Sequence, residues 1–172
     1  MVPERPPSTE YAPAFASYIS AVPDGDIADL LEKQLEVLRD LAAQVPGDRE
    51  TFRYGPDKWT IREVFGHLSD AERVFGYRLV SISRGDATPL PGFDENVYVA
   101  AANFNARPLQ ALADEFALLR RSNLMEIRAL DADAWQRIGL ANNKPVSVRA
   151  IAYVMAGHVN HHVAILHARY GL

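Results

Sequence analysis

The chain of 172 residues is long enough for one domain with its own hydrophobic core. Its 18 basic and 22 acidic residues give a formal charge of −4, without the basic stripe that is typical of a nucleic-acid-binding protein. The absence of cysteine excludes disulfides, thiolate nucleophiles and cysteine-type zinc sites. No apolar stretch resembles a signal peptide or a membrane span. We therefore expect a cytoplasmic protein that binds neither nucleic acid nor a membrane.

The N-terminal half of the sequence predicts an arm followed by the start of a single domain. The proline-rich residues 1–13 predict a flexible arm, and a short helix is expected over 13–20, so that the arm covers residues 1–20 and the domain residues 21–172. Asp26 can cap a helix from Ile27 to Val45, where apolar residues recur at helical spacing.

The middle of the chain predicts a second helix and then a long loop. Thr60 and Glu63 form a capping-box pattern, which predicts a helix from Ile61 to near Gly85. Residues 85–106 follow no helical or alternating pattern. A loop of about 20 residues is uncommon in a compact domain and is often functional.

Two more helices are predicted in the C-terminal half. The first begins after Pro108 and carries apolar residues at helical spacing as far as Leu130. Residues 131–146 are expected to be a connector with a turn and no strand. Ser147 can then cap a helix from Val148 to Tyr170, which Gly171 ends. Four long amphipathic helices with one long connection predict an all-α four-helix bundle.

Four of the five histidines fall between residues 158 and 167, and the fifth is His67. At about 100° per residue, His158 and His162 lie on the apolar stripe of the last helix, whereas His167 faces away. An unpaired buried imidazole costs roughly 1–3 kcal/mol, so these two rings need a partner. Either each ring hydrogen-bonds a carbonyl or an acid, or the two bind one metal ion, because their spacing is that of paired histidines in helical zinc sites.

His67 lies at the edge of the apolar stripe of the second helix and could face the same interior. Three histidines with an open fourth position are typical of a catalytic metal site. Imidazole suits zinc, nickel, iron and manganese, and a set without a carboxylate leans toward zinc or nickel.

Three stretches of the chain resemble the DinB-like family, which includes the YfiT-like metal-dependent hydrolases. They are YGPDKWTIREVFGHLSDAERVFGYRL (54–79), PLPGFDENVYV (89–99) and SVRAIAYVMAGHVNHHVAIL (147–166), and the similarity extends from about Tyr18 to Tyr170. The resemblance implies a four-helix bundle of up-down-down-up type with zinc or nickel bound by His67, His158 and His162. It also implies a homodimer, and relatives in the superfamily transfer or isomerise low-molecular-weight thiol adducts.

These observations predict a metal-dependent enzyme that acts on a small-molecule substrate. An ion held by three neutral histidines keeps its full charge, so it can activate either water, as in a hydrolase, or a small thiol, as in a thiol-dependent transferase. The alternative is a non-catalytic metal- or ligand-binding stress-response module, in which the histidines serve structure or a ligand.

Other residues are candidates for the same site. Asp70, one turn beyond the histidine of the second helix, is either a general base, a partner that orients a ligand, or a surface acid. His161 is either a proton shuttle or a solvent-facing or interface residue. Trp59 is expected in the core or in the wall of the pocket, and Asp94 and Tyr98 are expected to cover the mouth of the site.

Overall fold

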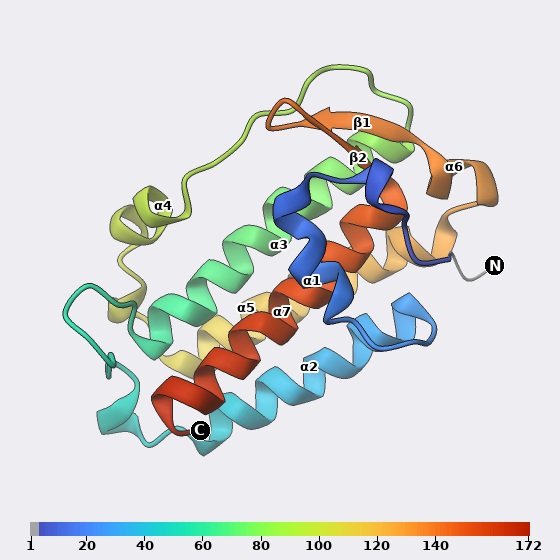
Figure 1. The fold of residues 1–172 in the computed structure, drawn as a ribbon. Coiled ribbons are helices and arrows are strands. Elements are labelled where there is room, and N and C mark those ends of the chain that lie inside the picture. The colour runs from blue at the N-terminus through green and yellow to red at the C-terminus, as the bar shows by residue number, and fades with distance from the viewer. Residues whose placement is uncertain (1–3) are drawn as a thin grey trace.

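The computed structural model describes residues 4–172 and contains a bundle of four long helices. These are α2 (Ile27–Gln44), α3 (Ile61–Ser83), α5 (Leu109–Ala129) and α7 (Val148–Tyr170). Both α2 and α3 pack against α5 and against α7. In Figure 1, α2 and α7 run in one direction and α3 and α5 in the other. The predicted four-helix bundle of up-down-down-up type is therefore confirmed.

Shorter elements connect and cover these helices. They are the helices α1 (Ala16–Ser20), α4 (Glu95–Ala102) and α6 (Ala132–Gln136), the 3₁₀ turns η1 (Ser8–Glu10), η2 (Pro13–Phe15), η3 (Gly47–Arg49) and η4 (Phe104–Ala106), and the antiparallel strands β1 (Ile138–Ala141) and β2 (Lys144–Ser147). Within residues 4–172, no helix combines the length and apolarity that crossing a bilayer requires.

The predicted helix ends are confirmed by their capping hydrogen bonds. The Asp26 side chain accepts from the second and third backbone amides of α2, and the Ser147 side chain accepts from the third amide of α7. Thr60 and Glu63 form the reciprocal capping box at the start of α3. Gly171 ends α7 in the left-handed conformation, with φ of 71°.

Two predicted irregular segments contain regular structure. The predicted loop at residues 85–106 includes α4, in which only Val99 is buried, so that no apolar stripe marks the helix in the sequence. The predicted strandless connector at 131–146 contains α6 and most of the β1–β2 hairpin, whose turn residues Asn142 and Asn143 have φ of 51° and 58°. Strands of four residues are too short to show an alternating pattern.

From residue 4 the N-terminal arm, which the sequence predicts to be flexible, lies against the bundle; residues 1–3 lie outside the described part. Arg5 donates hydrogen bonds to the carbonyl oxygens of Ile19 and Val22. Glu10 forms an ion pair with Arg149 at the start of α7. Apolar contacts add to these polar ones, because Tyr11, Phe15 and Tyr18 pack against the hydrophobic core.

A buried polar network connects the four long helices. Arg120 of α5 is fully buried, and its Nε and Nη2 donate to the Glu72 carboxylate of α3 at 2.8 and 2.9 Å. Its Nη1 donates to Gln34 Oε1 of α2 at 2.8 Å. Gln34 Nε2 in turn donates to the Ala156 carbonyl oxygen of α7 at 2.8 Å. One side-chain network therefore fixes how the four helices are aligned along their axes.

We expect Arg120→Met to lower the free energy of unfolding by about 3–5 kcal/mol, because it leaves the Glu72 carboxylate buried without a positive partner. Urea unfolding followed by circular dichroism measures the change. The matched control is Arg128→Met on the same helix, which removes an exposed pair with Glu32 and should leave the urea midpoint nearly unchanged. Equal midpoints for the two variants would contradict the stabilising role of the network.

Candidate metal centre

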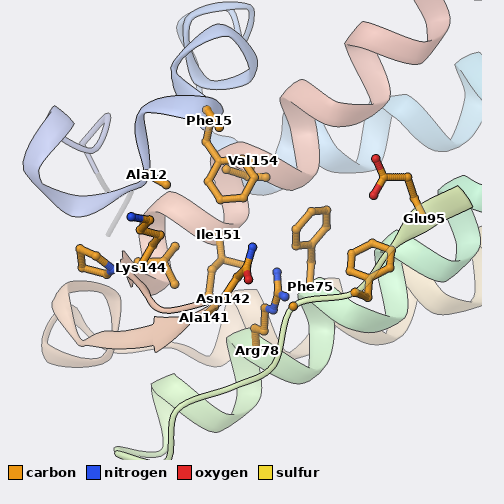
Figure 2. Close-up of a pocket in the computed structure, with 15 residues that line it drawn as sticks. Ala12, Phe15, Phe75, Arg78, Glu95, Ala141, Asn142, Lys144, Ile151 and Val154 are labelled. Atoms are coloured by element: carbon orange, nitrogen blue, oxygen red, sulfur yellow. The ribbon is translucent and has the colours of Figure 1, made fainter. Parts of the chain in front are cut away.

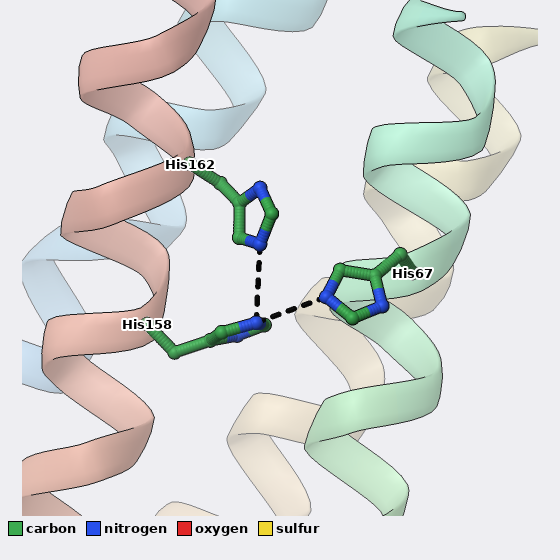
Figure 3. A group of neighbouring side chains, drawn as sticks. All are labelled: His67, His158 and His162. Carbon is green, nitrogen blue, oxygen red and sulfur yellow. Dashed lines mark hydrogen bonds between the residues drawn. The ribbon is translucent and has the colours of Figure 1, made fainter. Parts of the chain in front are cut away.

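Helices α3 and α7 bring three histidines to one point (Figure 3). His67 Nε2 lies 3.0 Å from His158 Nε2, and His162 Nε2 lies 3.1 Å from the same atom. All three side chains are buried, and their ligand atoms lie within 4.8 Å of one another. The three histidines therefore lie together as predicted, although His67 and His158 are 91 residues apart in the sequence.

The arrangement fits a metal ion better than a set of hydrogen bonds. One neutral ring can donate from Nε2 to a single partner, yet His158 Nε2 faces two other Nε2 atoms. Zinc–imidazole bonds of about 2.0–2.1 Å in tetrahedral geometry separate neighbouring nitrogen atoms by about 3.3 Å. The observed separations of 3.0 and 3.1 Å are close to this value. The residues therefore fit one ion held by three Nε2 atoms.

Burial keeps the three rings neutral. It lowers the pKa of His67 to about 4 and that of His162 to about 3, and the nearby His161 acts in the same direction. Burial also lowers the pKa of His158, with the neighbouring histidines and Arg120 contributing. A neutral imidazole has the free lone pair that a metal ion needs, so the site is ready to bind at neutral pH.

Aromatic rings enclose the cluster. The Trp59 ring lies 4.7 Å from the His67 ring and stacks on the His162 ring at 6.4 Å, so it lies against the cluster. Phe75 and Tyr18 pack against His158 at 5.9 and 5.7 Å. Such a shell excludes water and strengthens electrostatic interactions inside it.

Sequence reasoning expected a short helix at 13–20 but missed Tyr18, because the sequence of that helix does not show what it packs against. The helix lies against α7 at Gly157, where a Cβ atom would collide with the carbonyl oxygen of Tyr18. The absence of a side chain at Gly157 therefore allows α1 to cover the cluster beside His158. This contact could not be read from spacing within either segment.

The two candidate catalytic residues lie in different surroundings. Asp70 is partly buried and forms an ion pair with Arg73 at 3.5 Å, and Arg73 also pairs with Glu115 of α5. Burial raises the pKa of Asp70. None of its hydrogen bonds within residues 4–172 reaches the three histidines. His161 is exposed, and its ring lies 5.2 Å from the His162 ring and 5.3 Å from the Tyr18 ring.

A hollow of about 220 Å³ borders His162 and Trp59. The segment predicted to cover the mouth contributes Asn96 to its lining. Asp94 instead caps α4, and Tyr98 is exposed and packs on Phe93. Asn96 therefore lines this hollow whereas Asp94 and Tyr98 do not, and their covering of the mouth of the site stays a prediction.

The metal-free protein should lose stability as the pH falls below about 6.5, the unfolded-state pKa of histidine. His67 has a folded-state pKa of about 4, so the unfolded chain binds more protons between these pH values. We expect His67→Leu to reduce the loss of unfolding free energy between about pH 7.5 and pH 5 by about 2 kcal/mol. Urea titrations at the two pH values measure it.

The control for this measurement is His167→Leu, which alters an exposed histidine on the opposite face of α7 and should keep the wild-type pH dependence. An unchanged pH dependence in His67→Leu would show that His67 is not held neutral by its burial.

Comparison with solved structures shows the same fold in proteins of low identity. YfiT from Bacillus subtilis, described as "a probable metal-dependent hydrolase with an unusual four-helix bundle topology", has a TM-score of 0.73 at 17% identity, over 84% of this chain and 86% of that one. A mycothiol-dependent maleylpyruvate isomerase has a TM-score of 0.68 at 14% identity, over 85% of this chain and 61% of that longer one. A DinB-like protein from Bacillus subtilis, YjoA, has a TM-score of 0.58 at 16% identity, over 86% and 93% of the two chains.

The family comparison covers most of the bundle. No curated protein matches the chain. The family model of the DinB superfamily matches residues 30–166, a span that includes His67, His158 and His162. Together with the shared four-helix bundle, this match shows that the chain belongs to the DinB superfamily.

Proposed function

We propose that the protein is a metal-dependent enzyme with one divalent ion held by His67, His158 and His162. The observation that carries the proposal is the convergence of three buried, neutral Nε2 atoms with no other hydrogen-bond partner. The cluster found within residues 4–172 contains histidines alone, so its ligands do not reduce the charge of the ion. This donor set favours zinc or nickel. When bound, the ion would supply Lewis-acid chemistry that activates water or a thiol.

Two reaction classes fit this site, a hydrolase and a thiol-dependent transferase. The descriptions of YfiT as a metal-dependent hydrolase and of the isomerase as mycothiol-dependent support one class each. The chain has no cysteine, so a thiol would have to come from a low-molecular-weight cofactor. The hollow beside His162 supports a small-molecule substrate. A homodimer is part of the proposal and is supported by the family resemblance, and a cytoplasmic location is supported by the absence of cysteine.

We assign distinct tasks to the residues around the ion. Trp59 and Phe75 exclude water on two sides of the cluster. His161 is exposed and close to His162, so it is placed to move protons between solvent and the site. Asp70, in its ion pair with Arg73, is proposed to position α3 against α5 around the site.

The first test is the metal content of the untagged protein, measured by mass spectrometry. We expect about one zinc or nickel ion per chain in the wild type, and its loss in His67→Ala and in His158→Ala, because two imidazoles hold an ion much less tightly than three. His167→Ala should retain the ion, since its side chain lies on the other face of α7.

Absence of metal from the wild type, even after incubation with zinc or nickel, would contradict the proposal. The alternative of a non-catalytic binding module would then be favoured. The same holds if the histidine variants keep the wild-type metal content.

The second test concerns catalysis. The metal-loaded protein should turn over at least one member of a panel of esters and thiol adducts, and a chelator should abolish this activity until metal is restored. His161→Gln should keep the ion and lower turnover by roughly 10²-fold if the ring transfers protons. Turnover by chelated protein at the original rate would contradict a metal-dependent reaction.

A further inference from the structure

A second hollow, of about 300 Å³, lies between α3, α7, the β1–β2 hairpin and the N-terminal segment (Figure 2). Its walls are largely apolar and aromatic: Phe15, Phe75, Phe93, Val146, Ile151 and Val154. Pockets of this size and composition, with a few polar groups, are typical of small-molecule sites.

Arg78 of α3 points into this hollow, although the residue is only 6% exposed (Figure 2). Its Nη2 donates to the Pro91 carbonyl oxygen at 2.8 Å, and no carboxylate within residues 4–172 forms an ion pair with it. The fully buried Arg120, in contrast, is paired with Glu72. A buried guanidinium without a negative partner is costly, and four of its five N–H groups remain for a ligand.

Arg78 lines the hollow, and none of its nitrogen atoms is among the fully enclosed atoms without a partner in the described residues. The fully enclosed side-chain atoms without a partner belong to other residues, His67 and Ser69. Lys144 of β2 and Glu95 of α4 also line the hollow, but both are exposed, so water screens their charges. The least screened charge in the lining is therefore the positive charge of Arg78.

Backbone hydrogen bonds fix the segment that contacts Arg78 to the hairpin. The segment that carries Pro91 is attached to the hairpin, since Leu90 N donates to Leu140 O at 2.8 Å and Asn142 N donates to Leu90 O at 3.0 Å. Gly92 allows this close approach, because a Cβ there would lie 2.6 Å from Asn142 Oδ1. The hydrogen bond to the Pro91 carbonyl oxygen therefore ties the guanidinium to a segment that is itself bound to the hairpin, and a group positioned before binding costs less entropy to order.

We propose that this hollow binds a small molecule with a carboxylate and an apolar body. The carboxylate pairs with Arg78, whose planar fork matches two carboxylate oxygens, and the apolar part lies against Phe75 and Val154. Phe75 also packs on His158, with ring centres 5.9 Å apart, so the occupant lies one side chain away from the candidate metal centre. The site needs no ion and stands independently of the proposed enzymatic function.

The test is calorimetric titration of the metal-free protein with 4-phenylbutyrate and with its neutral amide, which has nearly the same shape. We expect the wild type to bind the carboxylate at least tenfold more tightly than the amide. Arg78→Met should abolish this preference, and Arg78→Lys should retain part of it. Arg84→Met, at the C-cap of the same helix, removes an exposed pair with Glu126 and should leave both affinities unchanged.

Equal affinities for the carboxylate and the amide, or no binding of either, would overturn the proposal, and this comparison uses the wild type alone. Unchanged carboxylate binding in folded Arg78→Met, checked by circular dichroism, would also overturn it. His67→Ala separates this site from the histidine cluster, because the variant removes one of the three rings and should keep the carboxylate affinity. Loss of the preference only in His67→Ala would place the ligand at the histidines and overturn the assignment to Arg78.

Discussion

The buried ion pair between Arg120 and Glu72 constrains the whole bundle. Removing two charges from water is costly, so the pair is stable only when α3 and α5 are aligned closely enough to form both hydrogen bonds. Gln34 extends the same requirement to α2 and, through the Ala156 carbonyl oxygen, to α7. Apolar packing brings the four helices together, whereas this network selects one alignment among several that would bury similar surface.

The same alignment sets the chemistry of the candidate metal centre. Ala156 lies two residues before His158, and Glu72 lies five residues after His67, so the network holds both helices close to their histidines. Arg120 also contributes to lowering the pKa of His158. The charge of Arg120 thus acts twice: it pairs with Glu72 in the network, and it favours the neutral form of His158 that a metal ion needs.

Much of this could be read from the sequence because it depends on local pattern. Helical spacing and capping residues located the long helices, and the spacing of His158 and His162 placed both rings in the interior. The docking of α1, the direction of α4 and the hairpin could not be predicted in this way. They depend on contacts between distant segments, such as Glu10 with Arg149 or Leu90 with Leu140, which leave no periodic signal in either partner.

The contact between α1 and α7 gives the cluster an unusual kind of cover. Because the Tyr18 carbonyl oxygen lies where a Cβ of residue 157 would be, the gap between the cover and the histidines is determined by a missing methyl group. The Tyr18 ring also packs on His158, so both the backbone and a side chain of α1 cover this side of the site. How exposed the histidines are on this side therefore depends on how the N-terminal segment is anchored. Substitutions in its anchoring contacts, far from the histidines, can change that exposure.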